Sequence, residues 1–115
     1  MAIFMYSWKL NPDTARALVE HPENREAANR GLFERFGGRL LGYYLTGGGA
    51  FDGIILCELP DAATARAVHL LQTASGKFER MEGMQLFTAT EAERIAMTAR
   101  SQQGAWLPPG HQGEA

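Results

Sequence analysis

Residues 42–52 read Gly-Tyr-Tyr-Leu-Thr-Gly-Gly-Gly-Ala-Phe-Asp, and the apolar run Ile-Ile-Leu-Cys follows at residues 54–57. Two runs typical of β-strands therefore flank three consecutive glycines. Because glycine adopts positive φ at little steric cost, the chain can reverse its direction within this glycine run. The stretch predicts a β-hairpin that joins a strand over residues 39–45 to a strand over residues 51–58.

Two further strands and four helices are predicted around this hairpin. Residues 2–8 and 78–87 are predicted to form the first and the last strand. Apolar spacing and turn residues predict helices over residues 13–20, 22–36, 61–75 and 90–100. The order β-α-β-β-α-β with an extra C-terminal helix is that of the ferredoxin-like fold. We therefore expect an α+β domain whose helices cover one face of a four-stranded antiparallel sheet.

The sequence also predicts how the helices begin and which sides are apolar. Pro22 suits the first turn of the second helix, and Asp61 is a candidate N-cap of the third. Thr90 and Glu93 match a capping box for the last helix. The expected apolar sides comprise Ala28, Leu32 and Phe36, with close packing at Gly31, in the second helix, and Ala63, Ala67, Leu70, Leu71 and Ala74 in the third. His69 lies off the apolar side of the third helix and is expected to be solvated.

Length and composition indicate one ordinary globular domain. The chain has 115 residues, 45% of them hydrophobic, and a formal net charge of −2. Its arginines are scattered and no basic run occurs, which argues against a nucleic-acid partner. No apolar stretch approaches about 18 residues, which argues against a membrane span. We expect a domain over residues 1–101, followed by a tail rich in Gln, Gly and Pro over residues 102–115.

The chain contains a single cysteine, Cys57, within an apolar run. An intramolecular disulfide is therefore excluded, and a buried thiol is expected. The N-terminus begins directly with a strand-like run and lacks the pattern of a signal peptide. A cytoplasmic location is the expectation.

The predicted strands are apolar on both of their faces. In the first strand, Ile3 and Met5 alternate with Phe4 and Tyr6. Because helices would cover only one face of the sheet, a monomer would expose an apolar patch on the other face. A second copy related by a two-fold axis would cover this patch. We therefore expect a homodimer through the open sheet face, in the manner of a dimeric α+β barrel.

Several short motifs are distributed over most of the chain. They are Ser-Trp at 7–8, His-Pro at 21–22, Phe-Gly-Gly-Arg-Leu at 36–40, Gly-Tyr-Tyr-Leu-Thr at 42–46, Asp52, and Glu-Leu-Pro-Asp-Ala-Ala-Thr-Ala at 58–65. Together they resemble the GYD-domain family of small bacterial proteins, from about residue 3 to about residue 95. The Gly-x-Tyr-Asp signature of the family reads Gly-Ala-Phe-Asp at residues 49–52, so the aspartate is kept and the tyrosine is not. The resemblance implies a dimeric α+β barrel and no settled activity.

Asp52 and Tyr44 are the candidate catalytic residues. Strand alternation places Asp52 on the same face as Ile54, Leu56 and Glu58. If that face were enclosed, the carboxylate would be desolvated and suited to act as a general base. The competing interpretation is an aspartate that accepts hydrogen bonds from backbone N–H groups of the hairpin. Tyr44 would donate a hydrogen bond in the first case.

Trp8, Tyr6, Tyr43 and His21 are the candidate ligand-binding residues. Aromatic side chains on adjacent strands can line a pocket for a flat molecule, although they more often belong to the core. Tyr43 and Tyr44 point to opposite faces, so only one of them can enter a given cavity. No metal site is expected, because His21, His69 and His111 lack ligand spacing. The glycine run joins two strands and is not a phosphate loop, which precedes a helix.

Two functions follow from these observations. The first is a dimeric module without assigned activity, whose inner space is either filled by side chains or holds a small apolar or aromatic ligand. The second is a cofactor-free monooxygenase or isomerase, which rests on analogy with other dimeric α+β barrels. No cofactor is expected in either case.

Overall fold

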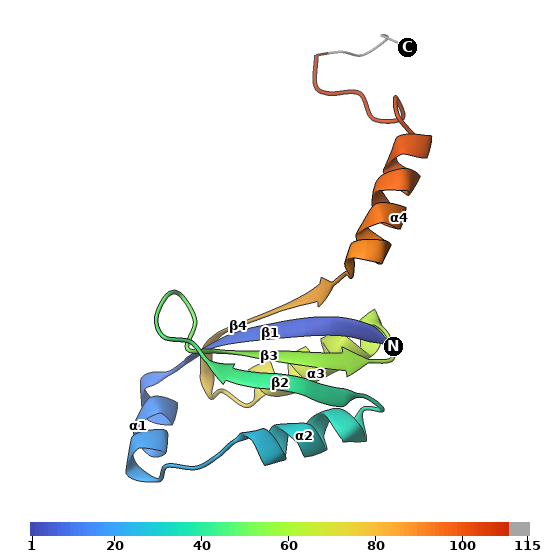
Figure 1. The fold of residues 1–115 in the computed structure, drawn as a ribbon. Helices are drawn as coiled ribbons and strands as arrows, with labels where there is room; N and C mark the ends of the chain where they lie inside the picture. Colours follow the sequence, from blue (N-terminus) through green and yellow to red (C-terminus); the bar gives the residue numbers. More distant parts are fainter. Residues whose placement is uncertain (111–115) are drawn as a thin grey trace.

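A four-stranded sheet with helices packed on one face forms the centre of the computed structural model, which describes residues 1–110 (Figure 1). The strands are β1 (Ala2–Leu10), β2 (Arg39–Leu45), β3 (Gly53–Leu59) and β4 (Phe78–Leu86). The helices are α1 (Pro12–Glu20), α2 (Glu26–Arg35), α3 (Ala62–Ala74) and α4 (Ala89–Ser101). The strands lie in the order β2-β3-β1-β4, and every neighbouring pair is antiparallel. This is the predicted ferredoxin-like α+β fold.

The β2–β3 hairpin is confirmed and closes at the glycine run. Gly48 and Gly49 adopt positive φ values of 144° and 99°. These values are sterically unfavourable for residues that have a Cβ atom. The Thr46 N–H donates to the Asp52 carbonyl at 2.9 Å, and the Asp52 N–H donates to the Trp8 carbonyl at 2.7 Å. Backbone hydrogen bonds therefore join the two ends of the hairpin loop and also join the loop to the end of β1.

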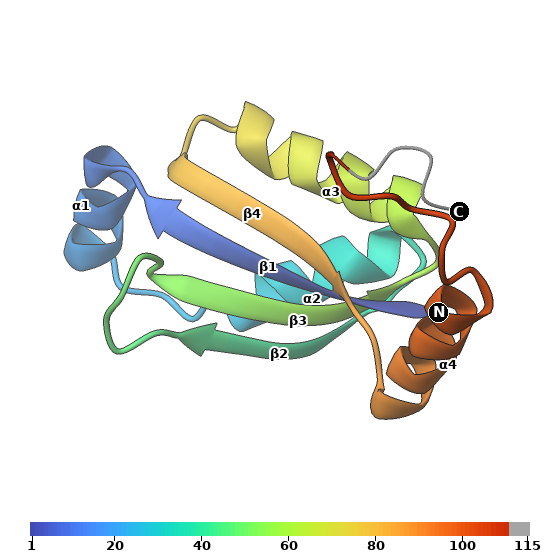
Figure 2. The ribbon, with the colours of Figure 1, turned by 90° about the horizontal axis from the view of Figure 1, so that it is seen from above.

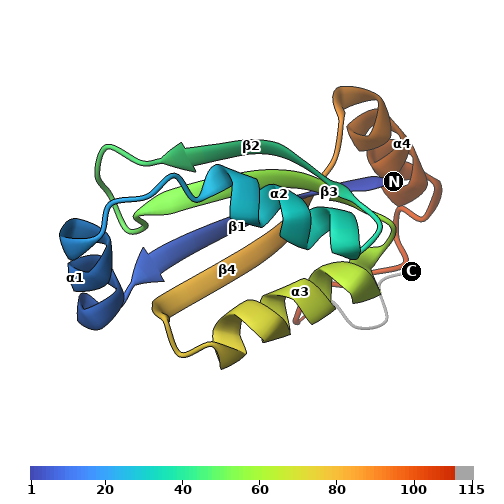
Figure 3. The same cartoon turned by 90° about the horizontal axis from the view of Figure 1, so that it is seen from below.

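Helices α2 and α3 cover the same face of the sheet (Figure 3). The core beneath them contains alternate residues of the two central strands, because successive strand residues point to opposite faces. Phe4, Tyr6 and Trp8 come from β1, and Ile55, Cys57 and Leu59 come from β3. Phe33 of α2 and Val68 of α3 complete this core and are fully buried.

Trp8 requires a glycine on the neighbouring strand. Gly53 is paired with Trp8 in the β1–β3 register. A Cβ atom at Gly53 would lie 2.2 Å from an atom of the indole ring, closer than any real contact. The indole therefore occupies the space that a side chain of β3 would need.

The predicted apolar side of α3 is wrong. Ala65 and Val68 are the buried residues of this helix, whereas Leu70 and Leu71 are 56% and 54% exposed. Alanine occurs on several sides of α3, so the apolar pattern carries little directional information. The helix is instead oriented by the contacts of Ala65 and Val68 with the core.

Helix α2 also differs from its prediction. It begins at Glu26, and Pro22 lies in the segment that joins α1 to α2. Its buried anchor is Phe33, with Leu32 and Phe36 packed partly against the core. Gly31 is exposed and has open space around it, so close packing on the sheet does not explain this glycine.

The N-caps show which local patterns identify a helix start. Asp61 caps α3 as predicted, and its Oδ1 accepts from the Thr64 N–H at 2.8 Å. The capping box of α4 uses Thr88 and Glu91 instead of Thr90 and Glu93. The sequence contains two overlapping capping-box patterns, one from Thr88 to Glu91 and one from Thr90 to Glu93. The helix begins with the first because β4 ends at Leu86, shortly before it.

The second face of the sheet carries no helix in the part of the chain that the structure describes. Its apolar residues are Ile3, Met5, Ile54, Leu56, Met84 and Leu86, together with the half-exposed ring of Tyr44. Figure 2 shows this face, with α2 behind the strands and α4 at the end where β4 finishes. No residue of α4 is buried. We call this surface the open face.

Within residues 1–110, no helix has the length and apolar character needed to cross a membrane. The domain boundary after residue 101 stays a prediction. His111 of the predicted tail lies outside the described residues.

Candidate functional site

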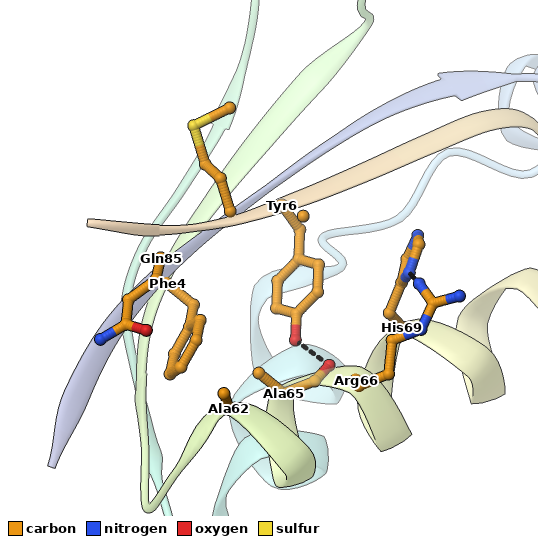
Figure 4. A pocket seen from close by; sticks show the side chains of 9 residues that line it. Phe4, Tyr6, Ala62, Ala65, Arg66, His69 and Gln85 are labelled. Carbon is orange, nitrogen blue, oxygen red and sulfur yellow. Dashed lines mark hydrogen bonds between the residues drawn. The ribbon is translucent and has the colours of Figure 1, made fainter. Parts of the chain in front are cut away.

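A cavity of about 210 Å³ lies between helix α3 and strands β1 and β4 (Figure 4). We call it the α3–β4 cavity. It is lined by Phe4, Tyr6, Ala62, Ala65, Arg66, His69, Gly83, Met84 and Gln85. Its wall is mostly apolar, and its polar groups come from one side of α3 and from the end of β4. An apolar cavity with few converging polar groups is the usual form of a small-molecule site.

Tyr6 forms the floor of this cavity. Its ring is 1% exposed, and its hydroxyl donates a hydrogen bond of 2.6 Å to the Ala65 carbonyl of α3. Burial, with a smaller contribution from Cys57, raises the pKa of the Tyr6 hydroxyl above its ordinary value. The phenol therefore stays protonated and joins β1 to α3 as a structural donor.

Arg66 and His69 border the cavity from α3. An Nη1 atom of Arg66 contacts Nδ1 of His69, and Nε2 of His69 lies 3.0 Å from the Met81 carbonyl. Because a guanidinium only donates and a carbonyl only accepts, Nδ1 must accept and Nε2 must carry the proton. In this arrangement the imidazole accepts through Nδ1 and donates through Nε2. It is half-buried against β4, so the expectation that it is solvated was wrong.

Trp8 and Tyr43 lie on the helix-covered face, outside the α3–β4 cavity. Their ring centroids are 5.2 Å apart, and Trp8 is buried in the core. Tyr43 borders a second hollow of about 330 Å³, formed with the α1–α2 connection. Burial raises the pKa of the Tyr43 hydroxyl, while nearby Arg25 lowers it and Glu23 raises it.

Asp52 lies at the end of the sheet where the hairpin meets β1. Its Oδ2 accepts a hydrogen bond of 2.8 Å from the Leu10 N–H, and its Oδ1 lies 3.5 Å from Nζ of Lys9. The carboxylate therefore bonds a backbone N–H of β1 instead of one within the hairpin. Asp52 lines neither of the two cavities.

The other predicted site residues are dispersed. Tyr44 is 55% exposed on the open face, opposite to Trp8 and Tyr6. His21 is exposed at the C-terminal end of α1. Of the six predicted site residues, only Tyr6 lines the α3–β4 cavity.

Cys57 is buried in the core, as expected. Its thiol lies 3.7 Å from the Phe4 carbonyl, and burial raises its pKa to about 12. A thiol with so high a pKa is a poor nucleophile near neutral pH. Among residues 1–110, no three His, Cys, Asp or Glu side chains are grouped to hold a metal ion.

The model of the GYD domain matches residues 4–96. The chain belongs to the GYD domain family. Two solved structures resemble this GYD domain, and both are uncharacterised proteins from Burkholderia xenovorans. A NIPSNAP domain protein has 14% identity and a TM-score of 0.46, over 77% of this chain and 95% of that chain. A NIPSNAP-like domain protein has 19% identity and a TM-score of 0.47, over 75% of this chain and 83% of that chain.

No curated protein matches this GYD domain. Sequence reasoning missed Arg66, His69 and Gln85 as lining residues. Arg66 and His69 are three residues apart on one helix, a spacing that places side chains together. That spacing is the one local sequence signal that predicts a contact between Arg66 and His69.

Proposed function

We propose that this GYD domain is a homodimeric binding module that holds a small apolar or aromatic molecule in the α3–β4 cavity. The observation that supports it is the cavity itself, whose wall is formed largely by Phe4, Tyr6, Ala62 and Ala65. Its volume of about 210 Å³ is below the range of about 300–1,000 Å³ for drug-sized ligands. A small metabolite is therefore the expected occupant.

The composition of the open face supports the homodimer. Apolar residues of the three strands β1, β3 and β4 occupy its middle. Ion pairs lie toward its ends: Arg39 with Glu58 at 3.1 Å, Lys9 with Asp52 at 3.5 Å, and Arg80 with Glu82 at 2.6 Å. An apolar centre with a polar rim is the usual anatomy of a protein interface. A second copy would cover the apolar centre by a two-fold axis.

Native mass spectrometry of protein purified from its own host tests both parts. We expect two copies of the 12.6-kDa chain and an added small mass. Leu56→Asp, at the centre of the open face, should give a monomer. Leu70→Asp, on the exposed side of α3, is the matched control and should remain dimeric.

The ligand part is tested by Ala62→Phe, which fills the α3–β4 cavity from the start of α3. This variant should remain a dimer and lose the added mass. A wild-type monomer would contradict the dimer, and an added mass that persists in Ala62→Phe would contradict the cavity as its location.

A cofactor-free monooxygenase or isomerase is the alternative function. It has less support, because both oxygens of Asp52 already have partners in Leu10 and Lys9. Tyr44 lies on the other face of the sheet from the cavity. Substrate turnover that is lost in Asp52→Asn, with the fold retained, would favour the enzyme.

A cytoplasmic location is also proposed. Its support is the single buried cysteine, which needs no oxidising compartment. Fluorescence microscopy of a tagged chain in its host would test it.

A further inference from the structure

We infer that the α3–β4 cavity selects a small carboxylic acid with an apolar body, and that Arg66 binds its carboxylate. This inference rests on the proposed binding function and adds the chemical class of the ligand. Among the described residues, Arg66 is the one lining residue with a formal charge. No carboxylate of residues 1–110 lines the cavity, so the charge of Arg66 favours an anion.

Arg66 has donors to spare at the mouth of the cavity. A guanidinium carries five N–H donors in a planar fork. One nitrogen, Nη1, contacts Nδ1 of His69, and Arg66 forms no ion pair within residues 1–110. Arg16, Arg25, Arg30, Arg39 and Arg80 each pair with a carboxylate. Arg35, Arg94 and Arg100 share the absence of an ion pair within these residues, but they do not line the cavity.

His69 holds the guanidinium in place and is a positioning residue. Its ring is fixed by the bond of Nε2 to the Met81 carbonyl, so its Nδ1 lone pair has a fixed direction. An arginine held by one N–H loses less freedom when its other donors bind a ligand. Through His69, the Arg66 guanidinium at the mouth of the cavity is connected to β4.

The rest of the wall determines the body of the ligand. The Tyr6 proton is used by the Ala65 carbonyl, so the floor offers rings and methyl groups instead of a donor. The N-terminus of α3 adds little attraction for anions, because Asp61 already accepts from the Thr64 N–H. A planar monoanion therefore fits better than a phosphate ester. A guanidinium can bind either anion through two parallel N–H donors. A carboxylate, however, carries one negative charge for the single Arg66 cation, whereas a phosphate monoester carries about −1.5 to −2.

The test compares small acids with their uncharged amides. Benzoate, phenylacetate and hexanoate are titrated against benzamide, phenylacetamide and hexanamide, and binding is followed by ¹H–¹⁵N NMR of the whole protein. Acids should bind about tenfold tighter than their amides, since a charge-assisted hydrogen bond is roughly twice as strong as a neutral one. The shifted amides should be those of Ala65, Gly83 and Met84.

Two variants assign the residues. Arg66→Gln should abolish the preference for acids while amide binding is unchanged, and Arg30→Gln, on α2, is the matched control. His69→Gln should reduce the preference without weakening amide binding. A purely structural role of His69 would weaken acids and amides alike. Retained NMR dispersion in each variant shows that it folds.

The outcomes separate the two proposals. Equal binding of acids and amides in the cavity would overturn the carboxylate class and leave the binding function intact. Acid binding that Arg66→Gln does not change would overturn the role of Arg66. If no acid or amide shifts the cavity amides, both the binding function and its ligand class fail for molecules of this size.

Discussion

Substitution of Asp52 separates a structural role of this carboxylate from a catalytic one. Its Oδ2 accepts from the Leu10 N–H at 2.8 Å, and its Oδ1 lies 3.5 Å from Lys9 Nζ. Asp52→Ala removes both partners and leaves a half-buried N–H without an acceptor at the end of β1. Asp52→Asn removes the charge but keeps a side-chain oxygen that can accept from Leu10.

The two variants should differ in stability by a predictable amount. Leaving a buried donor unsatisfied costs about 1–3 kcal/mol. The side chain of Asp52 is 32% exposed, so water can partly replace it, and we expect about 1–1.5 kcal/mol for Asp52→Ala. The ion pair with Lys9 is largely exposed and contributes about 0–1 kcal/mol. Asp52→Asn should therefore lose no more than about 0.5 kcal/mol.

Urea unfolding, read as the midpoint at a common slope, measures both losses. Amide hydrogen exchange at Leu10 should accelerate in Asp52→Ala and stay near the wild-type rate in Asp52→Asn. Equal losses in the two variants would refute the hydrogen-bond argument and make the charge decisive. An unchanged midpoint in both would show that Asp52 is not a structural residue, and would return it to the catalytic hypothesis.

Two further predictions concern a helix and the buried thiol. Gly31→Ala should raise the free energy of unfolding by about 0.5–1 kcal/mol in urea, since the new Cβ meets no atom and alanine is the better helix former; a loss of stability would contradict the open space around Gly31. For Cys57, whose pKa is raised to about 12, the unfolded thiol ionises above about pH 8.5 while the folded thiol does not. Its stabilising contribution is therefore complete below that pH and falls as pH rises toward the folded value. The advantage of wild type over Cys57→Ala in urea should shrink between about pH 8.5 and pH 11, and an advantage independent of pH would contradict the raised pKa.

The fold was predictable because its signals are local. The glycine run and its two flanking strands predicted the hairpin, and Asp61 predicted the start of α3. Helix α3 shows the limit of such signals, since alanines on several sides conceal the side that packs. Its orientation depends on Tyr6, which is 59 residues from its hydrogen-bond partner Ala65.

The candidate site was less predictable than the fold. Residue type alone predicts the aromatic site residues, and the sheet separates them: Tyr6 and Trp8 lie on one face and Tyr44 on the other. The partner of Asp52 is 42 residues away in sequence. The role of His69 depends on the Met81 carbonyl, which belongs to a different element. Contacts of this kind arise from the packing of distant segments and leave no periodic pattern.

The close approach of Trp8 to Gly53 has a consequence for how this domain can change. The space for the indole is supplied by a missing side chain on the adjacent strand. A side chain at residue 53 would be tolerated only together with a smaller residue at position 8, whereas a smaller residue at position 8 creates no clash with Gly53. Variation at residue 53 of this GYD domain is therefore restricted to compensated double changes, even though this position looks like an ordinary strand residue.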